Sequence, residues 1–287
     1  MNQISRRQWM GTAAAALGAA APARAATFRH PLGAQLYTVR AITPTKAEET
    51  LRAIGEIGYR EVELGRAELP KFAPFLKQDR LKPVSCHVEA PLITGDDRSG
   101  LSSAIDELKK YGVEYLVLPY IRPEDRGDLD FFRKLTGKMN LAGEQCHAAG
   151  LQFCYHNHAF EFAGEKGQRP IDLMIERLDP KNVGFEMDVF WVSVAGNDPV
   201  AMLGQLKGRV PLLHLKDEKR GAPTQYNEKV SKDTFQEVGH GSLDFPAILR
   251  AAEAAGVKHY FVEQDQTPGD PVASLKQSYD YLRDLKI

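Results

Sequence analysis

Short apolar runs alternate with longer helix-like segments through almost the whole of this 287-residue chain. One unit takes about 30 residues, the usual length of a strand, a connection and a covering helix. Continuous apolar runs are typical of parallel strands that are buried on both faces. Eight such units predict an α/β fold, a closed (β/α)8 TIM barrel. The predicted strands are 34–37, 61–64, 84–88, 115–120, 151–157, 183–187, 210–215 and 260–262.

The intervening segments carry helix signals. Leu101, Ile105 and Leu108 recur on one side of a helix over 101–111. Gly150 and Gly256 follow two predicted helices, and helices commonly end at glycine. A doubly wound open sheet is the alternative, but no glycine-rich dinucleotide fingerprint follows the first strand. The other predicted helices are 46–57, 72–77, 131–149, 171–178, 199–206, 245–255 and 271–285, and 218–241 is expected to be the longest loop.

The first 25 residues are typical of an export signal rather than of the fold. Arg6 and Arg7 precede a short alanine-rich run, and Ala23-Arg24-Ala25 is a small-x-small cleavage site. The arginine pair indicates the twin-arginine type, which predicts a periplasmic or otherwise exported protein. The run is too short to span a membrane, which takes about 20 apolar residues. We therefore expect a signal over 1–25 and one catalytic barrel domain over 26–287.

Charge and cysteine content restrict the function. Removing residues 1–25 takes away three arginines and no acid, so the net charge falls from −1 to −4. A mildly acidic chain is poorly suited to nucleic acid, because phosphate binding needs clustered lysine and arginine. Cys86, Cys146 and Cys154 show neither CxxC nor zinc spacing, and we expect them to be small buried hydrophobes.

Polar side chains gather where the predicted strands end, the edge at which barrels of this type form their active sites. Four of them, from different strands, predict a mixed carboxylate and imidazole metal site: Glu161, Asp188, His214 and Glu263. Oxygen and nitrogen ligands of this kind suit Mn²⁺, Co²⁺, Mg²⁺ or Zn²⁺. The whole polar set is Gln35, Tyr37, Glu63, His87, Tyr120, His156, Asn157, His158, Glu161, Asp188, His214, Lys216 and Glu263.

Several motifs resemble the xylose isomerase-like barrels, a family of sugar phosphate isomerases and epimerases. They are GAQLYTVR (33–40), VELG (62–65), YHNHAFEF (155–162), EMDVFWV (186–192), HLKD (214–217), VGHGSLDFPAIL (238–249) and VEQD (262–265). The resemblance covers roughly 34–285. It implies one divalent metal, Mn²⁺ first among the candidates, on Glu161, Asp188, His214 and Glu263. His156 or His158 is the alternative to Glu161, because ketose epimerases of the family carry this glutamate at the strand end. Trp191 stands where those epimerases tend to have a histidine.

The resemblance implies a sugar isomerase or epimerase that acts through an enediolate on a keto-sugar. Glu263 and Glu161 are the expected proton-transfer groups. His158 and His87 are expected to orient hydroxyls or to act as an acid, and Lys216 to stabilise the enediolate charge. The expected contacts to the carbohydrate substrate are Gln35, Glu63, His87, His156, Trp191 and Arg220.

Several alternatives remain open. Loss of a group β to the carbonyl would make the protein a 3-keto-glycoside lyase or hydrolase. An endonuclease IV-like phosphodiesterase is disfavoured by the charge, and a sugar-binding module without catalysis by the acids at 161 and 263. Export argues against a phosphorylated sugar, although Gly239-His240-Gly241 could cradle an anion or simply form a loop turn. We expect no nucleic-acid partner and no membrane contact after signal removal; a homodimer is left open.

Overall fold

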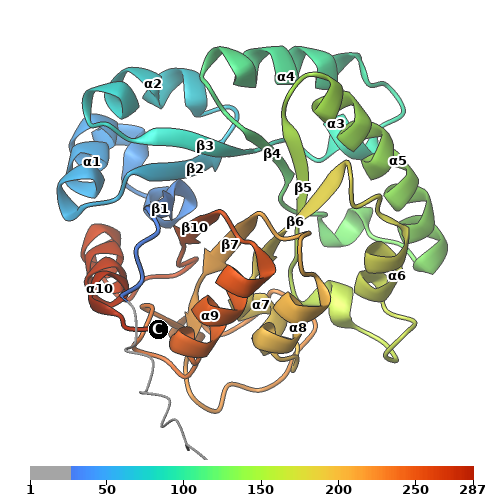
Figure 1. Cartoon of the computed structure of the whole chain (residues 1–287). Helices are drawn as coiled ribbons and strands as arrows, with labels where there is room; N and C mark the ends of the chain where they lie inside the picture. The colour runs from blue at the N-terminus through green and yellow to red at the C-terminus, as the bar shows by residue number, and fades with distance from the viewer. Residues whose placement is uncertain (1–26) are drawn as a thin grey trace, which may run out of the picture.

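The structure is a computed structural model that describes residues 27–287. Its strands close into a parallel barrel in the order β1-β10-β7-β6-β5-β4-β3-β2 (Figure 1). The predicted (β/α)8 TIM barrel is confirmed, while the export signal over 1–25 lies outside the described residues. The barrel strands are β1 (Leu32–Gln35), β2 (Glu61–Gly65), β3 (Lys82–His87), β4 (Tyr115–Leu118), β5 (Gln152–His156), β6 (Val183–Asp188), β7 (Leu212–Leu215) and β10 (His259–Val262).

Helices form the outer layer and return the chain from each strand to the next. The last helix also closes the domain, because Phe28 N donates to Leu285 O at 3.0 Å beside the start of β1. No helix within 27–287 is both long and apolar enough to cross a membrane. The helices are α1 (Thr43–Ile57), α2 (Leu69–Gln78), α3 (Pro91–Thr94), α4 (Ser99–Lys110), α5 (Leu129–Ala148), α6 (Pro170–Arg177), α7 (Val189–Val194), α8 (Pro199–Gln205), α9 (Phe245–Ala255) and α10 (Pro271–Asp284).

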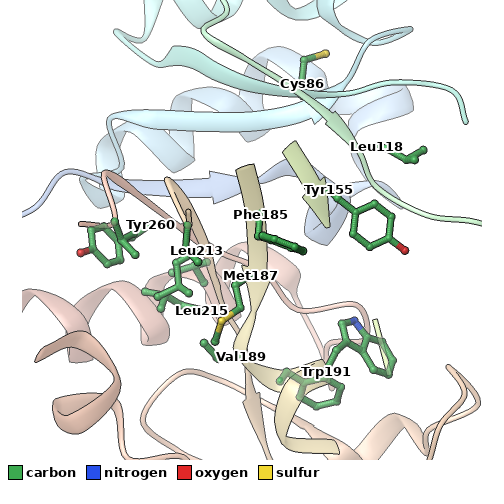
Figure 2. Packing of buried hydrophobic residues seen from close by; sticks show 14 of the residues in the cluster. Cys86, Leu118, Tyr155, Phe185, Met187, Val189, Trp191, Leu213, Leu215 and Tyr260 are labelled. Carbon is green, nitrogen blue, oxygen red and sulfur yellow. The ribbon is translucent and has the colours of Figure 1, made fainter. Parts of the chain in front are cut away.

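The main core lies between the barrel and the helices. Alternation along a strand sends Phe185 and Met187 of β6 outward into this layer, where both are buried (Figure 2). The same alternation turns Glu186 and Asp188 to the inside of the barrel. The apolar strand residues therefore provide the hydrophobic stabilisation, and the polar residues between them are free to build a site.

The barrel interior contains a second, smaller apolar cluster. Phe261 packs against the backbone of Gly33, where a Cβ would lie 2.4 Å from the Phe261 ring. Only glycine leaves room for the phenylalanine at this point of β1. The cluster forms a floor below the polar residues near the strand ends, and its members are Val84, Tyr115, Val117, Cys154, Leu212 and Phe261.

The structure differs from the sequence-based expectation in the first strand, in two helices that were not predicted, α3 and α7, and in one loop. The strand predicted at 34–37 ends at Gln35, because the Gln35 side chain accepts from Tyr37 N at 3.0 Å and the chain turns into a 3-10 helix, Leu36–Val39. The expected loop contains two short antiparallel strands, β8 (Asp217–Glu218) and β9 (Phe235–Gln236). We call residues 219–234 between them the β8–β9 excursion.

The three cysteines are free and buried, as predicted.

Candidate active site

A buried polar layer lies above the apolar floor, built from inward-facing residues of β1, β2, β5, β6 and β7. Gln35 Nε2 donates to Glu63 Oε1 at 2.6 Å, and His214 Nε2 lies 2.7 Å from the same oxygen. On the other side of the barrel, His156 Nδ1 lies 3.0 Å from Glu186 Oε2. Glu63 and His214 are 151 positions apart in the chain, so only barrel closure brings them together.

His87 of β3 completes this layer. Its Nε2 lies 2.8 Å from Glu63 Oε1 and 3.0 Å from Glu186 Oε2. Although burial opposes both shifts, the carboxylates of Glu63 and Glu186 raise the pKa of His87 to about 10, and the imidazoles of His87 and His214 hold the pKa of Glu63 well below its ordinary value. The layer is therefore a network of mutually stabilised acids and histidines.

Asp188 stands at the end of β6 and begins α7. Its Oδ1 accepts from Phe190 N at 2.9 Å and Trp191 N at 3.1 Å, so backbone hydrogen bonds fix the carboxylate. Its buried Oδ2 has no aligned hydrogen bond, although Lys216 Nζ lies 3.0 Å away. The second oxygen of Asp188 is therefore presented to the site.

Lys216 and Glu263 lie on either side of this oxygen. Lys216 Nζ is 2.8 Å from Glu263 Oε2 and 2.9 Å from Asp265 Oδ1, and His214 Nδ1 is 2.9 Å from Glu263 Oε2. Burial alone would lower the pKa of Lys216, but the carboxylates of Asp188, Asp265 and Glu263 hold it well above its ordinary value. The three carboxylates around Lys216 therefore favour its charged form.

The donor set fits a divalent cation. Asp188, His214 and Glu263 each offer a ligand atom, and these atoms lie within 4.8 Å of one another. Within 27–287, Lys216 is the only lysine or arginine in ion-pair contact with this carboxylate cluster. Buried carboxylates in such excess are costly unless a cation or proton compensates them. Of the expected ligands, these three come together, and His156 is adjacent, with Nε2 3.9 Å from Asp188 Oδ2.

Glu161, the fourth expected ligand, lies apart from this group of three. It also lies apart from a second metal-compatible group, which consists of His87, His156, Glu186 and His214. Its Oε1 accepts from Tyr155 OH at 2.6 Å, and its Oε2 accepts from His158 N at 3.0 Å. Burial raises the pKa of Glu161 to about 7. The reason for the difference is local: residues 157–162 turn back after β5, so this carboxylate braces its own loop instead of reaching the cluster.

A cavity of about 770 Å³ opens above the cluster. The predicted substrate contacts Gln35, His87, His156 and Trp191 line it, whereas Glu63 lies beneath it and Arg220 is exposed outside it. Among the predicted catalytic residues, its lining contains His158, Lys216 and Glu263 and lacks Glu161.

Sequence reasoning missed Glu186, although it precedes Asp188 by two positions on a strand and so faces the same side. It also missed Asp265, two residues beyond Glu263.

The segment 239–241 binds an anion, but this anion is a carboxylate of the protein itself, that of Asp217. The Asp217 Oδ2 accepts from Gly239 N at 3.0 Å and Gly241 N at 2.9 Å, and its Oδ1 accepts from Ser242 N and Leu243 N, each at 3.1 Å. A Cβ at Gly241 would lie 2.3 Å from Asp217 Oδ1. The Asp217 side chain therefore already occupies these backbone donors. The structure agrees with the prediction of a loop turn for this segment.

Together, the closed barrel and the acid–histidine site at its strand ends define an α/β-barrel enzyme. The chain belongs to the xylose isomerase-like TIM barrel family, whose model matches residues 51–285.

Curated relatives include inosose dehydratases. The protein of Geobacillus thermodenitrificans is 27% identical over 160 residues, 52% of this chain and 53% of that protein. The match thus spans about half the length of this relative. The protein of Mesomycoplasma hyopneumoniae strain 7448 is 23% identical over 267 residues, 82% of this chain and 88% of its own.

Solved structures share the fold. A sugar phosphate isomerase/epimerase from Parabacteroides distasonis aligns with a TM-score of 0.73 and 25% identity, covering 88% of this chain and 97% of that one. The likeness to two others is one of fold alone. A zinc-bound IolI protein has a TM-score of 0.68 and 14% identity, covering 87% and 95% of the two chains. The 3-keto-D-glucoside 4-epimerase YcjR from E. coli has a TM-score of 0.64 and 17% identity, covering 89% and 99%.

Proposed function

We propose that this protein is a divalent-metal-dependent isomerase or epimerase that removes a proton beside the carbonyl of a non-phosphorylated keto-sugar. The observation that carries the proposal is the buried group of Asp188, His214 and Glu263 with Lys216 at the floor of the cavity. A cation site next to a fixed ammonium suits the negative charge that develops on the carbonyl oxygen of an enediolate.

Each residue receives a role from its position. Asp188, His214 and Glu263 would hold the ion, with His156 as the adjacent fourth donor, and Mn²⁺ is our first choice of metal. The bound ion supplies Lewis-acid polarisation of the substrate carbonyl. Glu263 reaches the cavity and takes the proton, and Lys216 stabilises the charge that results.

His158 is placed to orient a substrate hydroxyl, and Glu263 returns the proton that it has taken, because burial and the neighbouring charge of Lys216 hold the pKa of His158 well below its ordinary value. His158 lines the cavity, and its buried Nδ1 has no hydrogen-bond partner among residues 27–287. Glu161 holds the His158 backbone and acts only through it. This role of Glu161 differs from the sequence-based expectation, in which Glu161 itself transferred a proton.

Elimination is the second candidate. The curated relatives are named inosose dehydratases, and loss of water begins with the same proton abstraction beside a carbonyl. Lyase chemistry would differ only afterwards, when the enediolate expels a β substituent instead of accepting a proton.

NMR in D₂O on a panel of ketoses and 3-keto-glycosides, with Mn²⁺ present, tests the proposal. For the first candidate we expect deuterium at the carbon beside the carbonyl of an isomer or epimer. For the second we expect loss of the hydrogen from that carbon together with release of the β group. Glu263→Gln should abolish the exchange. Asp188→Asn should lower the bound metal measured by elemental analysis. The proposal fails if the protein exchanges no proton of any keto-sugar, or if chelation leaves exchange unchanged.

We also propose that residues 1–25 direct twin-arginine export, which would expose the enzyme to free sugars more than to sugar phosphates. The backbone donors of 239–241 are occupied by Asp217 and are therefore not free to bind a substrate phosphate. Replacing Arg6 and Arg7 with lysine should retain the protein in the cytoplasmic fraction of an expressing bacterium. Unchanged periplasmic recovery would refute the assignment.

A further inference from the structure

We infer that the outer part of the cavity is a second binding subsite that takes a second sugar ring, so that the substrate is a glycoside of the disaccharide type. This inference rests on the proposed function, because the reacting keto-sugar is taken to occupy the floor. The cavity of about 770 Å³ is near the upper end of the range for pockets that enclose drug-sized ligands, and so is larger than one sugar ring requires.

Aromatic side chains line the cavity from its floor outward: Trp191 lies beside Lys216, with Nζ 5.6 Å from its ring centroid, and Tyr37 and Tyr120 are the more exposed ones. Tyr37, Tyr120, Trp191 and Phe235 all line the cavity. Aromatic rings offer flat apolar surfaces, and a sugar ring presents an apolar C–H face that can lie on them. Tyr37 is 51% exposed and lines the cavity, so its ring is accessible to a ligand.

Tyr37 is held in place rather than left free. The Arg40 guanidinium lies 3.9 Å from its ring centroid. Arg40 also donates to Tyr37 O at 2.8 Å and to Asp265 O at 2.7 Å. The Asp265 carboxylate contacts Lys216 Nζ. The Tyr37 ring is therefore linked, through Arg40 and Asp265, to the polar residues at the cavity floor. A second sugar ring on the Tyr37 side chain would therefore lie next to a sugar bound at the floor.

The opposite wall comes from the β8–β9 excursion, which supplies Glu228, Val230 and Lys232. Arg126 fixes this segment over the mouth: its Nη2 donates to Glu228 Oε1 at 2.8 Å, and its guanidinium carbon lies 3.4 Å from the Phe160 ring centroid. Charged groups of both signs beside aromatic rings suit a neutral ligand with many hydroxyl groups.

Turnover of a 3-keto-disaccharide and of the free 3-keto-hexose, each with Mn²⁺, tests the subsite. We expect kcat/KM to favour the disaccharide. Tyr37→Ala should lower kcat/KM for the disaccharide about tenfold, mainly through KM, and change the hexose less than about twofold. Tyr226→Ala is the matched control, since Tyr226 is 45% exposed and lies outside the cavity lining. Equal effects of Tyr37→Ala on both substrates, or none on either, would overturn the subsite.

A binding measurement separates this inference from the proposed reaction. The chain has two tryptophans, Trp9 and Trp191, so a Trp9→Phe protein reports Trp191 fluorescence alone. We expect maltose or cellobiose to bind more tightly than glucose, and Tyr37→Ala to remove that advantage. If no keto-sugar reacts but this advantage is found, the reaction is wrong and the subsite stands. If glucose binds as well as both disaccharides, the subsite is wrong.

Discussion

Lys216 Nζ lies 2.8 Å from Glu263 Oε2 inside the barrel, and both side chains are buried. This pair joins the one lysine or arginine in ion-pair contact with the carboxylate cluster, among the described residues, to the proposed base. A buried ammonium beside the expected position of a reacting oxygen makes charge stabilisation its natural role.

Replacement of this ammonium should therefore remove most of the activity. We expect Lys216→Met to lower kcat by about 10²–10³-fold, because a preorganised positive group is lost where negative charge develops. Lys219→Met is the control, since Lys219 is exposed and pairs only with exposed Asp233. Steady-state kinetics on protein whose fold is verified by circular dichroism measures the effect. A kcat within about threefold of the parent would contradict the assignment.

Glu161 should make stability depend on pH. Its folded-state pKa of about 7 exceeds the reference value of 4.5, so the folded protein binds this proton more tightly than the unfolded chain. The free energy of unfolding therefore falls as the pH rises from about 4.5 to about 7, by an amount on the order of 3 kcal/mol. Glu161→Gln should flatten this decline in urea titrations at several pH values. Glu165→Gln, at an exposed position of the same loop, is the matched control, and identical slopes in both variants would refute the role.

The Arg126–Glu228 pair should hold the β8–β9 excursion in place. Glu228→Gln keeps the side-chain size and weakens a partly buried ion pair, at a cost of about 1 kcal/mol. We expect faster amide hydrogen exchange in 219–234 and little change in the barrel strands. Asp233→Asn disturbs an exposed pair of the same segment and serves as the control. Equal exchange in the two variants would show that the pair does not order the excursion.

Gly241 should be intolerant of any side chain. A Cβ there would meet Asp217 Oδ1 at 2.3 Å and Glu218 O at 2.4 Å. Gly241→Ala should lower the free energy of unfolding by about 2 kcal/mol or more, because the carboxylate cradle must open. Gly204→Ala, where a Cβ meets nothing within 4 Å, is the comparison. Chemical denaturation of both variants decides the matter, and a Gly241→Ala protein as stable as the parent would refute the cradle.

The sequence predicted the barrel well because each strand is a short apolar run, a pattern that reflects burial on both faces. It could not predict α7, since Val189–Val194 is apolar on nearly every side and has no amphipathic period. The expected first strand was displaced because the turn depends on a side-chain hydrogen bond of Gln35, which periodicity does not reveal.

The candidate site was predictable where a residue ends a strand and not where loop geometry decides. Asp188, His214 and Glu263 follow from strand ends alone. Glu161 lies beyond the strand, and its direction depends on the turn at 157–162 and on Tyr155. Glu186 was hidden inside an apolar strand, and its contacts with His87 and His156 arise only when the barrel closes.

The apolar floor of the barrel governs how molecules enter and leave. Tyr115, Cys154, Leu212 and Phe261 fill the interior below the polar layer, so the cavity described by residues 27–287 opens on one side only. Substrate and product must share that entrance, beneath the β8–β9 excursion. Product must therefore leave by the path through which substrate enters, and its release can limit turnover.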